Sequence, residues 1–153
     1  GCELEIKADG SLDFPDEVLA GLDLVVASVH TSLRQDPAQM TQRVLGVLRN
    51  PYIDVVGHPS GRILGQRDES TVDLEIVIRT AAETGTALEV NSHPSRLDLD
   101  DVHIRQAVGQ GVPIAINSDA HHPDGLDVLF FGLATARRGW ARATDVLNCM
   151  TLD

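Results

Sequence analysis

Residues 71–90, TVDLEIVIRTAAETGTALEV, contain one complete helix-to-strand unit and decide the fold class. A helix-like stretch runs from Thr71 to Thr84, and Gly85 follows it as a stop signal. Ala87-Leu88-Glu89-Val90 then reads as a short strand, mostly apolar and therefore covered on both faces. The pattern predicts a helix that crosses over to a central parallel strand.

The same alternation continues outward from this unit in both directions. It predicts five strands and five helices, with no linker or repeat that would divide the chain. The expected strands cover residues 4–6, 24–29, 53–56, 87–90 and 113–116, and the expected helices cover 15–22, 38–48, 71–84, 101–110 and 133–140, with Asp13 as a start signal for the first. This order indicates an α/β fold of about five parallel strands with flanking helices, either an open doubly wound sheet or a stretch of a barrel.

Composition narrows the function classes. The 153 residues include 23 acidic and 12 basic side chains, for a net charge of −11, and 42% are hydrophobic. Such a surface repels a nucleic-acid backbone, so a basic groove is excluded, although bound cations would still attract a single phosphate group. No stretch is long enough for a membrane span, and Cys2 and Cys149 show no metal-knuckle spacing, which fits the reducing cytoplasm.

Chemically useful residues follow four of the expected strands. Because parallel strands end at one edge of a sheet, these clusters should converge in space. They are Ser28-Val29-His30, Gly57-His58-Pro59, the stretch from Glu89 to His93, and the stretch from Asn117 to His122.

Metal ligation is the chemistry that these residue types favour as a set. Asp119 and His121 are spaced so that a carboxylate and an imidazole can approach one cation. His30 and His58, taken singly, would be ordinary loop histidines, but with this pair they favour a catalytic site for Zn²⁺, Mn²⁺ or Fe. For Glu3 the sequence favours neither of two interpretations, a metal ligand or a solvent-facing residue of a strand.

Arginines after the second histidine suit a phosphate group. Arg62 and Arg67 could bind a substrate phosphate bidentately, although an exposed loop arginine is more often only solvated. Arg96 has the same two interpretations, with a further option of pairing with Asp98 or Asp100. His93 and His103 are assigned to structure or surface, and His122 is left open.

Short motifs spread over nearly the whole chain carry a family resemblance. They are Gly1-Cys2-Glu3-Leu4-Glu5-Ile6, residues 12–19 (LDFPDEVL), Ala27-Ser28-Val29-His30, Asn50-Pro51, residues 57–62 (GHPSGR), Glu89-Val90-Asn91, Arg96-Leu97-Asp98-Leu99, Ser118-Asp119-Ala120-His121 and residues 136–140 (ARRGW). On these residues the chain resembles the PHP (polymerase and histidinol phosphatase) domains, in particular those attached to bacterial family X DNA polymerases.

The resemblance implies a distorted (β/α)7, TIM-like barrel that binds up to three metal ions and hydrolyses phosphoesters. Glu3 matches the glutamate that bridges metals, and His30 and His58 match two histidine ligands. Asp119 and His121 match the closing Asp-x-His pair, which is expected to hold one metal and to be catalytic.

Residues 1–153 match only the C-terminal portion of such a domain, because the family's opening His-x-His strand has no counterpart here. The chain is therefore expected to hold fewer metal ions, to be weakly active or inactive alone, and to leave an exposed flank. A missing N-terminal segment or another copy of the chain would cover that flank.

The sequence is compatible with three functions. The first is a metal-dependent phosphodiesterase that acts on a DNA 3′ end beside a polymerase. The second is a stand-alone phosphatase of a small phosphomonoester such as histidinol phosphate. The third is a non-catalytic module that supports a polymerase.

Overall fold

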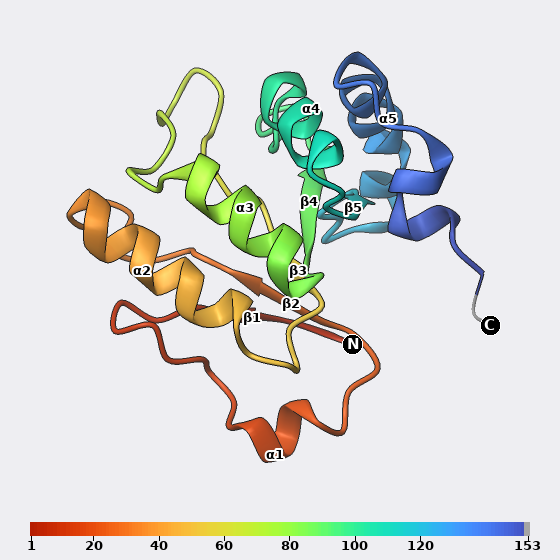
Figure 1. Cartoon of the computed structure of the whole chain (residues 1–153). Coiled ribbons are helices and arrows are strands. Elements are labelled where there is room, and N and C mark those ends of the chain that lie inside the picture. The colour runs from red at the N-terminus through yellow and green to blue at the C-terminus, as the bar shows by residue number, and fades with distance from the viewer. Residues whose placement is uncertain (152–153) are drawn as a thin grey trace.

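Five parallel strands form one sheet, and each strand lies beside the next strand of the chain (Figure 1). This computed structural model describes residues 1–151. The strands are β1 (Cys2–Glu5), β2 (Val25–Ser28), β3 (Val55–Val56), β4 (Ala87–Asn91) and β5 (Ile114–Asn117). An open doubly wound sheet reverses its strand order at a switch point, whereas this sheet keeps the chain order throughout. The α/β class is confirmed, and the order is that of a partial TIM-like barrel.

Helices connect the strands and pack against one another in the same sequence. Figure 1 shows α2, α3 and α4 side by side along the sheet, with α5 beyond them, and neighbouring helices are in contact. The α-helices are α1 (Asp16–Leu19), α2 (Pro37–Leu48), α3 (Leu74–Thr84), α4 (Asp101–Gly109) and α5 (Leu129–Arg138). Short 3-10 turns follow β5 and end the described chain: η1 (Pro123–Val128), η2 (Ala143–Asp145) and η3 (Leu147–Cys149). No helix within residues 1–151 is long and apolar enough to cross a membrane.

Local caps set the helix boundaries and explain where the sequence prediction was off. The Asp73 carboxylate accepts a hydrogen bond from the Ile76 N–H, so α3 begins at Leu74 rather than at Thr71. Its end is as expected, because Gly85 adopts the left-handed conformation with a φ of 78°. The last helix begins at Leu129, ahead of the expected residue 133, because η1 leads directly into it.

Asp13 has a different role from the expected helix-start signal. The residue before α1 is Pro15, which makes no side-chain cap. The Asp13 carboxylate instead accepts the Glu5 N–H at 3.2 Å, on the outer edge of β1. It also lies 3.7 Å from the Lys7 ammonium group. Asp13 therefore occupies an edge of the sheet, where an unpaired strand N–H needs an acceptor.

Alternation along β4 separates the core from the opposite face of the sheet. Leu88 and Val90 are fully buried in the main apolar cluster, which includes residues of α3 and α4. Glu89 and Asn91 therefore project from the other face of the strand. This opposite face is mixed: Val55, Ala87 and Ala115 form a small apolar cluster there, and Glu89 and Asn91 follow Ala87 along β4.

Both outer strands are partly covered by the chain itself. Leu12 forms a bridge with Ile6 just beyond β1. The amide of Asn148 accepts the Ile116 N–H at 2.8 Å and donates to the Ile116 carbonyl at 3.2 Å, on the outer edge of β5. These contacts occupy main-chain groups that would otherwise be open to a further strand.

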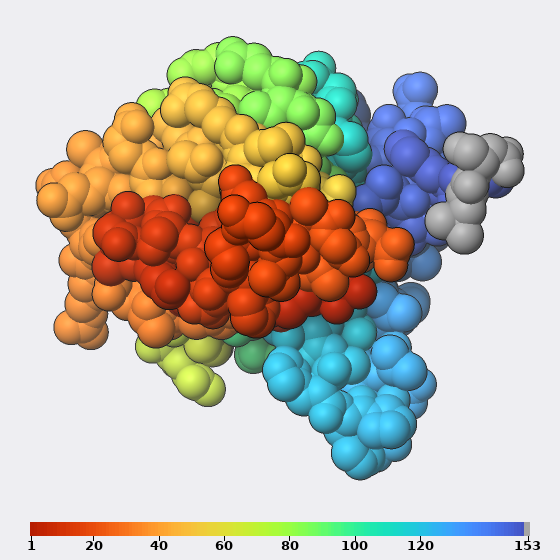
Figure 2. Space-filling model, turned by 90° about the horizontal axis from the view of Figure 1, so that it is seen from below, coloured from red at the N-terminus to blue at the C-terminus, as the bar shows by residue number. Residues whose placement is uncertain are grey.

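Exposed apolar side chains gather on η1 and α5. They are Leu126, Leu129, Phe130, Phe131 and Leu133, with Phe130 70% exposed. In the view from below, the light-blue segment that follows β5 projects beyond the rest of the molecule (Figure 2). The expectation that another segment or another copy of the chain covers an apolar flank stays a prediction.

We predict that Gly132→Ala destabilises the protein. A Cβ atom at this position of α5 would lie 2.0 Å from the Ser92 hydroxyl oxygen and 3.0 Å from a methyl group of Ile116. Overpacking of this kind costs about 1–3 kcal/mol of unfolding free energy, measurable by urea denaturation. Gly46→Ala in α2 is the matched control, because nothing lies within 4 Å of its Cβ and a helical alanine is favoured. Equal destabilisation by both changes would contradict the close packing of α5.

Candidate metal centre

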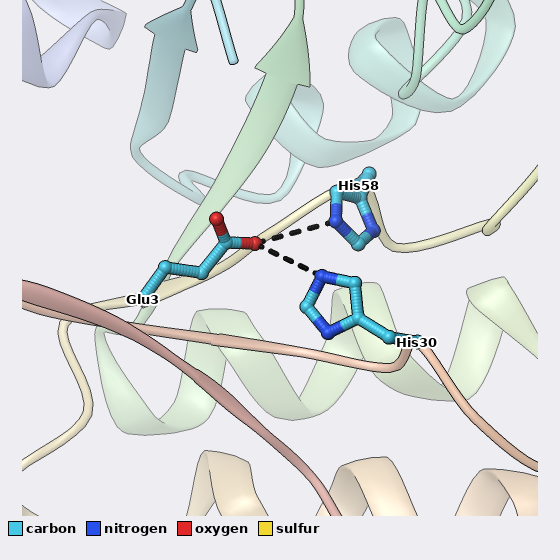
Figure 3. Close-up of side chains that lie close together, drawn as sticks. All are labelled: Glu3, His30 and His58. Carbon is cyan, nitrogen blue, oxygen red and sulfur yellow. Dashed lines mark ion pairs between the residues drawn. The ribbon is translucent and has the colours of Figure 1, made fainter. Parts of the chain in front are cut away.

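Three of the expected ligands lie close together. Glu3 lies in β1, His30 follows β2, and His58 follows β3. Glu3 Oε1 is 3.4 Å from His30 Nε2 and 3.3 Å from His58 Nε2 (Figure 3). One ligand atom from each residue lies within 4.8 Å of the others. The carboxylate thus faces two imidazole nitrogens from separate strands.

A glycine allows this close approach. Gly57 lies between β3 and His58, and a Cβ atom there would be 2.3 Å from the Ser28 hydroxyl oxygen. That hydroxyl donates a 2.7 Å hydrogen bond to Glu3 Oε1. A larger residue at position 57 would therefore displace the side chain that orients Glu3.

The short distance between Glu3 and His30 shifts the pKa values of both side chains. Hydrogen bonds from His30, and next from His58, hold the pKa of the Glu3 carboxyl well below its ordinary value. The same hydrogen bond with Glu3 raises the pKa of His30, with Glu5 contributing less. In the metal-free protein the pair favours a carboxylate beside an imidazolium, so a bound cation and the His30 proton would compete for the same place.

Glu5 orients the ring of His30. It lies two residues after Glu3 on the same face of β1, and its Oε2 is 2.8 Å from His30 Nδ1. Its other oxygen is 3.0 Å from the guanidinium of Arg43, which is almost fully buried and also donates to the Ile6 carbonyl. A carboxylate on Nδ1 fixes the tautomer in which Nε2 is available to a metal. The sequence prediction missed this role, although the Glu-x-Glu spacing was its signal.

Asp119 and His121 lie apart from this group. His121 Nδ1 is 3.7 Å from Asp119 Oδ1, but the His121 side chain is 87% exposed. Within residues 1–151, neither joins the group formed by Glu3, His30 and His58. Asp119 has a φ of 55°, and one oxygen of its carboxylate accepts a 3.0 Å hydrogen bond from Asn91. The metal-ligand roles of Asp119 and His121 stay predictions.

Buried polar residues on β4 and β5 connect the two parts. Burial raises the pKa of the Glu89 carboxyl, which accepts the His58 N–H at 2.6 Å and the Asn117 amide at 2.9 Å. Sequence analysis placed Glu89 and Asn91 in a strand-end cluster without giving them a function. A glutamate inside an otherwise apolar strand was the available signal, because a buried carboxylate needs partners.

The arginines divide into two roles. Arg62 is held within the chain: it donates to the carbonyls of Arg96 and Leu97, and its Nη1 is 3.4 Å from Glu69. Arg67 donates to the Gly61 carbonyl, and burial, followed by the nearby positive charge of Arg96, lowers its pKa. Within residues 1–151, ion pairs with carboxylates are recorded for Arg62 and not for Arg67, and the phosphate-binding roles of both stay predictions.

Arg96 lies beside Asp119. Its Nε is 3.3 Å from an Asp119 carboxylate oxygen, and its side chain is 19% exposed. In the described part of the chain, its Nη1 is buried without a hydrogen-bond partner. Arg96, Asp119 and His121 line a pocket of about 370 Å³. The ion pair recorded for Arg96 among residues 1–151 is with Asp119, and not with Asp98 or Asp100 as the sequence suggested as a further option.

The described chain contains a second group of ligand-type residues. Glu69, Asp100 and His103 are close together, and hydrogen bonding from His103 lowers the pKa of Asp100 to about 2. Arg62 Nη1 lies within 3.5 Å of both carboxylates. The acidic charge is thus already matched within the chain, as expected for a structural role of His103.

The donor set of the first group fits a divalent metal ion. One carboxylate and two imidazoles leave coordination positions for water and substrate, which is the composition of catalytic rather than structural sites. Glu5 supplies the carboxylate–histidine contact that usually supports such a ligand.

Several proteins that are similar to this chain in sequence carry the name probable phosphatase. The chain is 33% identical to a probable phosphatase of Syntrophotalea carbinolica, with 97% of this chain and 58% of that protein aligned. It is also 33% identical to a probable phosphatase of Thermoanaerobacter sp. (strain X514), over 79% of this chain and 51% of that protein. No protein-family model matches the chain.

A particular relative with higher identity is the DNA polymerase/3′-5′ exonuclease PolX of Bacillus subtilis (strain 168). The two are 41% identical over 152 residues, which is 99% of this chain and 27% of that protein. The chain thus spans about a quarter of PolX and about half of the probable phosphatases.

We predict that His30 titrates above its ordinary pKa of 6.5 in the metal-free protein, because Glu3 and Glu5 favour its charged form. Its contribution to stability is present below pH 6.5 and is lost as pH rises through the raised pKa. That of Glu3, whose pKa is lowered from 4.5, is present above pH 4.5 and is lost as pH falls through the lowered value. The pair should therefore stabilise the protein most between these pH values.

NMR titration of the His30 ring tests this directly. Glu3→Gln should lower the His30 midpoint, whereas Asp124→Asn, beside His122, should leave it unchanged. A midpoint at or below 6.5, or one insensitive to Glu3→Gln, would contradict the interaction.

Proposed function

We propose that residues 1–153 form the C-terminal portion of a PHP domain that hydrolyses phosphoesters with the help of divalent metal ions. The observation that carries the proposal is the convergence of Glu3, from within β1, with His30 and His58, which follow β2 and β3. The identity to PolX and to probable phosphatases supports phosphoester chemistry.

Glu3, His30 and His58 would hold one metal ion, and Asp119 with His121 would complete a neighbouring coordination site. A divalent cation in such a site supplies positive charge for phosphoryl oxygens and lowers the pKa of water, which is the usual basis of hydrolysis there. Zn²⁺, Mn²⁺ and Fe all suit this ligand mixture. The side chains of the protein then have to bind the metal ions, orient the substrate phosphate, and keep the histidine ligands neutral and the carboxylates ionised.

Arg67 and Arg96 would bind the substrate phosphate. The positive charge of Arg96 contributes to the lowered pKa of Arg67, after the larger effect of burial. An anion between them would relieve the repulsion between the two charges, and the unpartnered Nη1 of Arg96 has a donor to offer. In a chain of net charge −11, this local positive charge would select a phosphate group.

Two substrate classes are compatible with this site. The similarity to PolX favours a DNA 3′ end, and the similarity to probable phosphatases favours a small phosphomonoester. We favour the exonuclease-type activity, because the chain is 41% identical to PolX over 99% of its length. The relative rates on a 3′-labelled oligonucleotide and on p-nitrophenyl phosphate would distinguish the two.

We predict that Asp119→Ala abolishes Mn²⁺-dependent hydrolysis in the longest active protein that contains this sequence. Loss of a metal ligand should reduce kcat/KM on the order of 100-fold or more. Asp124→Ala is the control, because Asp124 is 91% exposed and pairs only with His122 among the described contacts. Unchanged activity and metal content in Asp119→Ala would favour the non-catalytic, structural alternative.

We also predict that Arg96→Gln weakens binding of inorganic phosphate to the Mn²⁺-loaded protein by about tenfold. A charge-assisted hydrogen bond contributes about 1.5–3 kcal/mol, and about 1.4 kcal/mol corresponds to a factor of ten. Calorimetric titration provides the measurement. Arg79→Gln, on the exposed side of α3, should bind phosphate as the unchanged protein does. Equal affinities in all three proteins would remove Arg96 from the phosphate site.

A further inference from the structure

We propose that Glu89 is a positioning residue that fixes His58 relative to Asp119, and so sets the spacing between the two parts of the metal centre. This inference rests on the proposed function, since it concerns residues assigned there as ligands. Glu89 itself binds neither metal nor substrate in this proposal, because main-chain and amide N–H groups occupy both of its oxygens.

The location of Glu89 gives it access to both parts. β4 lies between β3, which leads to His58, and β5, which leads to Asp119. The Glu89 side chain is on the opposite face from the apolar cluster and the residue is only 5% exposed. A buried carboxylate is costly unless its oxygens accept hydrogen bonds, so its retention within an apolar strand needs a compensating set of donors.

On one side, Glu89 holds the main chain at His58. β3 ends at Val56, and the His58 N–H points to a side-chain oxygen of the neighbouring strand, Glu89 Oε2 at 2.6 Å, rather than to a main-chain carbonyl. His58 has a φ of 27°, in the region that non-glycine residues avoid. Such a backbone conformation persists only where surrounding contacts stabilise it, and the hydrogen bond to Glu89 is one of these contacts.

On the other side, two amides connect Glu89 with Asp119. The Nδ2 of Asn91 is 3.3 Å from Glu89 Oε2 and 3.0 Å from Asp119 Oδ2, so one amide group spans both carboxylates. The Nδ2 of Asn117, two residues before Asp119, donates to Glu89 Oε1 at 2.9 Å. Asp119 also has a positive φ, 55°, so both ligands at the two ends of this bridge have unusual backbone conformations.

Every recorded partner of the Glu89 carboxyl is a donor, so an ionised carboxylate completes the bridge. Three N–H donors converge on Glu89, from His58, Asn91 and Asn117. Glutamine has nearly the same shape, but its amide group would present N–H to one of these donors. Glu89→Gln therefore preserves volume while it forces at least one connection to break or rotate.

We expect Glu89→Gln to weaken Co²⁺ binding, measured by titration of the metal's visible absorption, by about 10- to 100-fold. The double variant Glu89→Gln/Asn117→Asp should restore the affinity to within a few-fold. In that variant the amide introduced at position 89 donates to the carboxylate introduced at position 117, while its oxygen continues to accept from His58 and Asn91. A simple loss of packing would not be rescued by this exchange.

Asp54→Asn is the matched control. Its carboxylate accepts the Val25 N–H at 2.7 Å and so also links neighbouring strands, but at their opposite end. The control should bind Co²⁺ as the unchanged protein does. The inference is overturned if Glu89→Gln keeps full affinity, if Asp54→Asn loses as much, or if the double variant stays as weak as the single one.

A metal-free measurement separates this inference from the proposed function. The short hydrogen bond to a carboxylate should shift the His58 amide proton downfield in NMR spectra, and Glu89→Gln should move the amide resonances of both His58 and Asp119. If the unchanged protein fails to bind Co²⁺, the proposed function fails. If only one of the two resonances responds to Glu89→Gln, the bridge fails regardless of metal binding. Should Glu89→Gln not fold, Asn117→Asp alone, which places two carboxylates face to face, must shift the same two resonances.

Discussion

The parallel alignment of five strands in chain order is the constraint on which the site depends. Because every strand runs in the same direction, each connection leaves from the same edge of the sheet. Glu3, His30 and His58 are therefore neighbours in space although they belong to separate strand units. The helices stabilise this arrangement by covering one apolar face, and Glu89 and Asn91 lie on the opposite face, beyond the small apolar cluster of Val55, Ala87 and Ala115.

Electrostatic matching keeps these charges tolerable inside an acidic protein. Glu3 faces two imidazoles, and Glu5 faces an imidazole and the buried guanidinium of Arg43. In the other part of the site, the Arg96 guanidinium lies beside the Asp119 carboxylate. Each carboxylate thus has a local cationic partner that a divalent ion would replace or supplement, and such an ion is the largest charge that the site would receive.

The expected metal ligands lie in two groups, and buried polar residues connect the two groups. The group around Glu3 is tightly connected, whereas His121 projects into solvent beside Asp119. Glu89 and Asn91 provide contacts between these parts through the middle of the sheet. The chain spans only part of each relative, and the apolar side chains on η1 and α5 are exposed in this structure. Completion of the site by additional protein is consistent with both observations, and stays a proposal.

The sequence by itself determined the α/β class, the existence of all five strands, and the strand-end placement of the histidines, because hydrophobic runs and turn residues are local signals. Strand order separated a barrel-like sheet from a doubly wound one, and only tertiary structure could decide it, because helix-to-strand alternation is common to both. Local signals marked Glu5 and Glu89 as unusual, but only the tertiary structure identified the partners of Glu5, Glu89 and Arg96. Each depends on partners in a different strand unit, and side-chain direction across a folded sheet selects those partners.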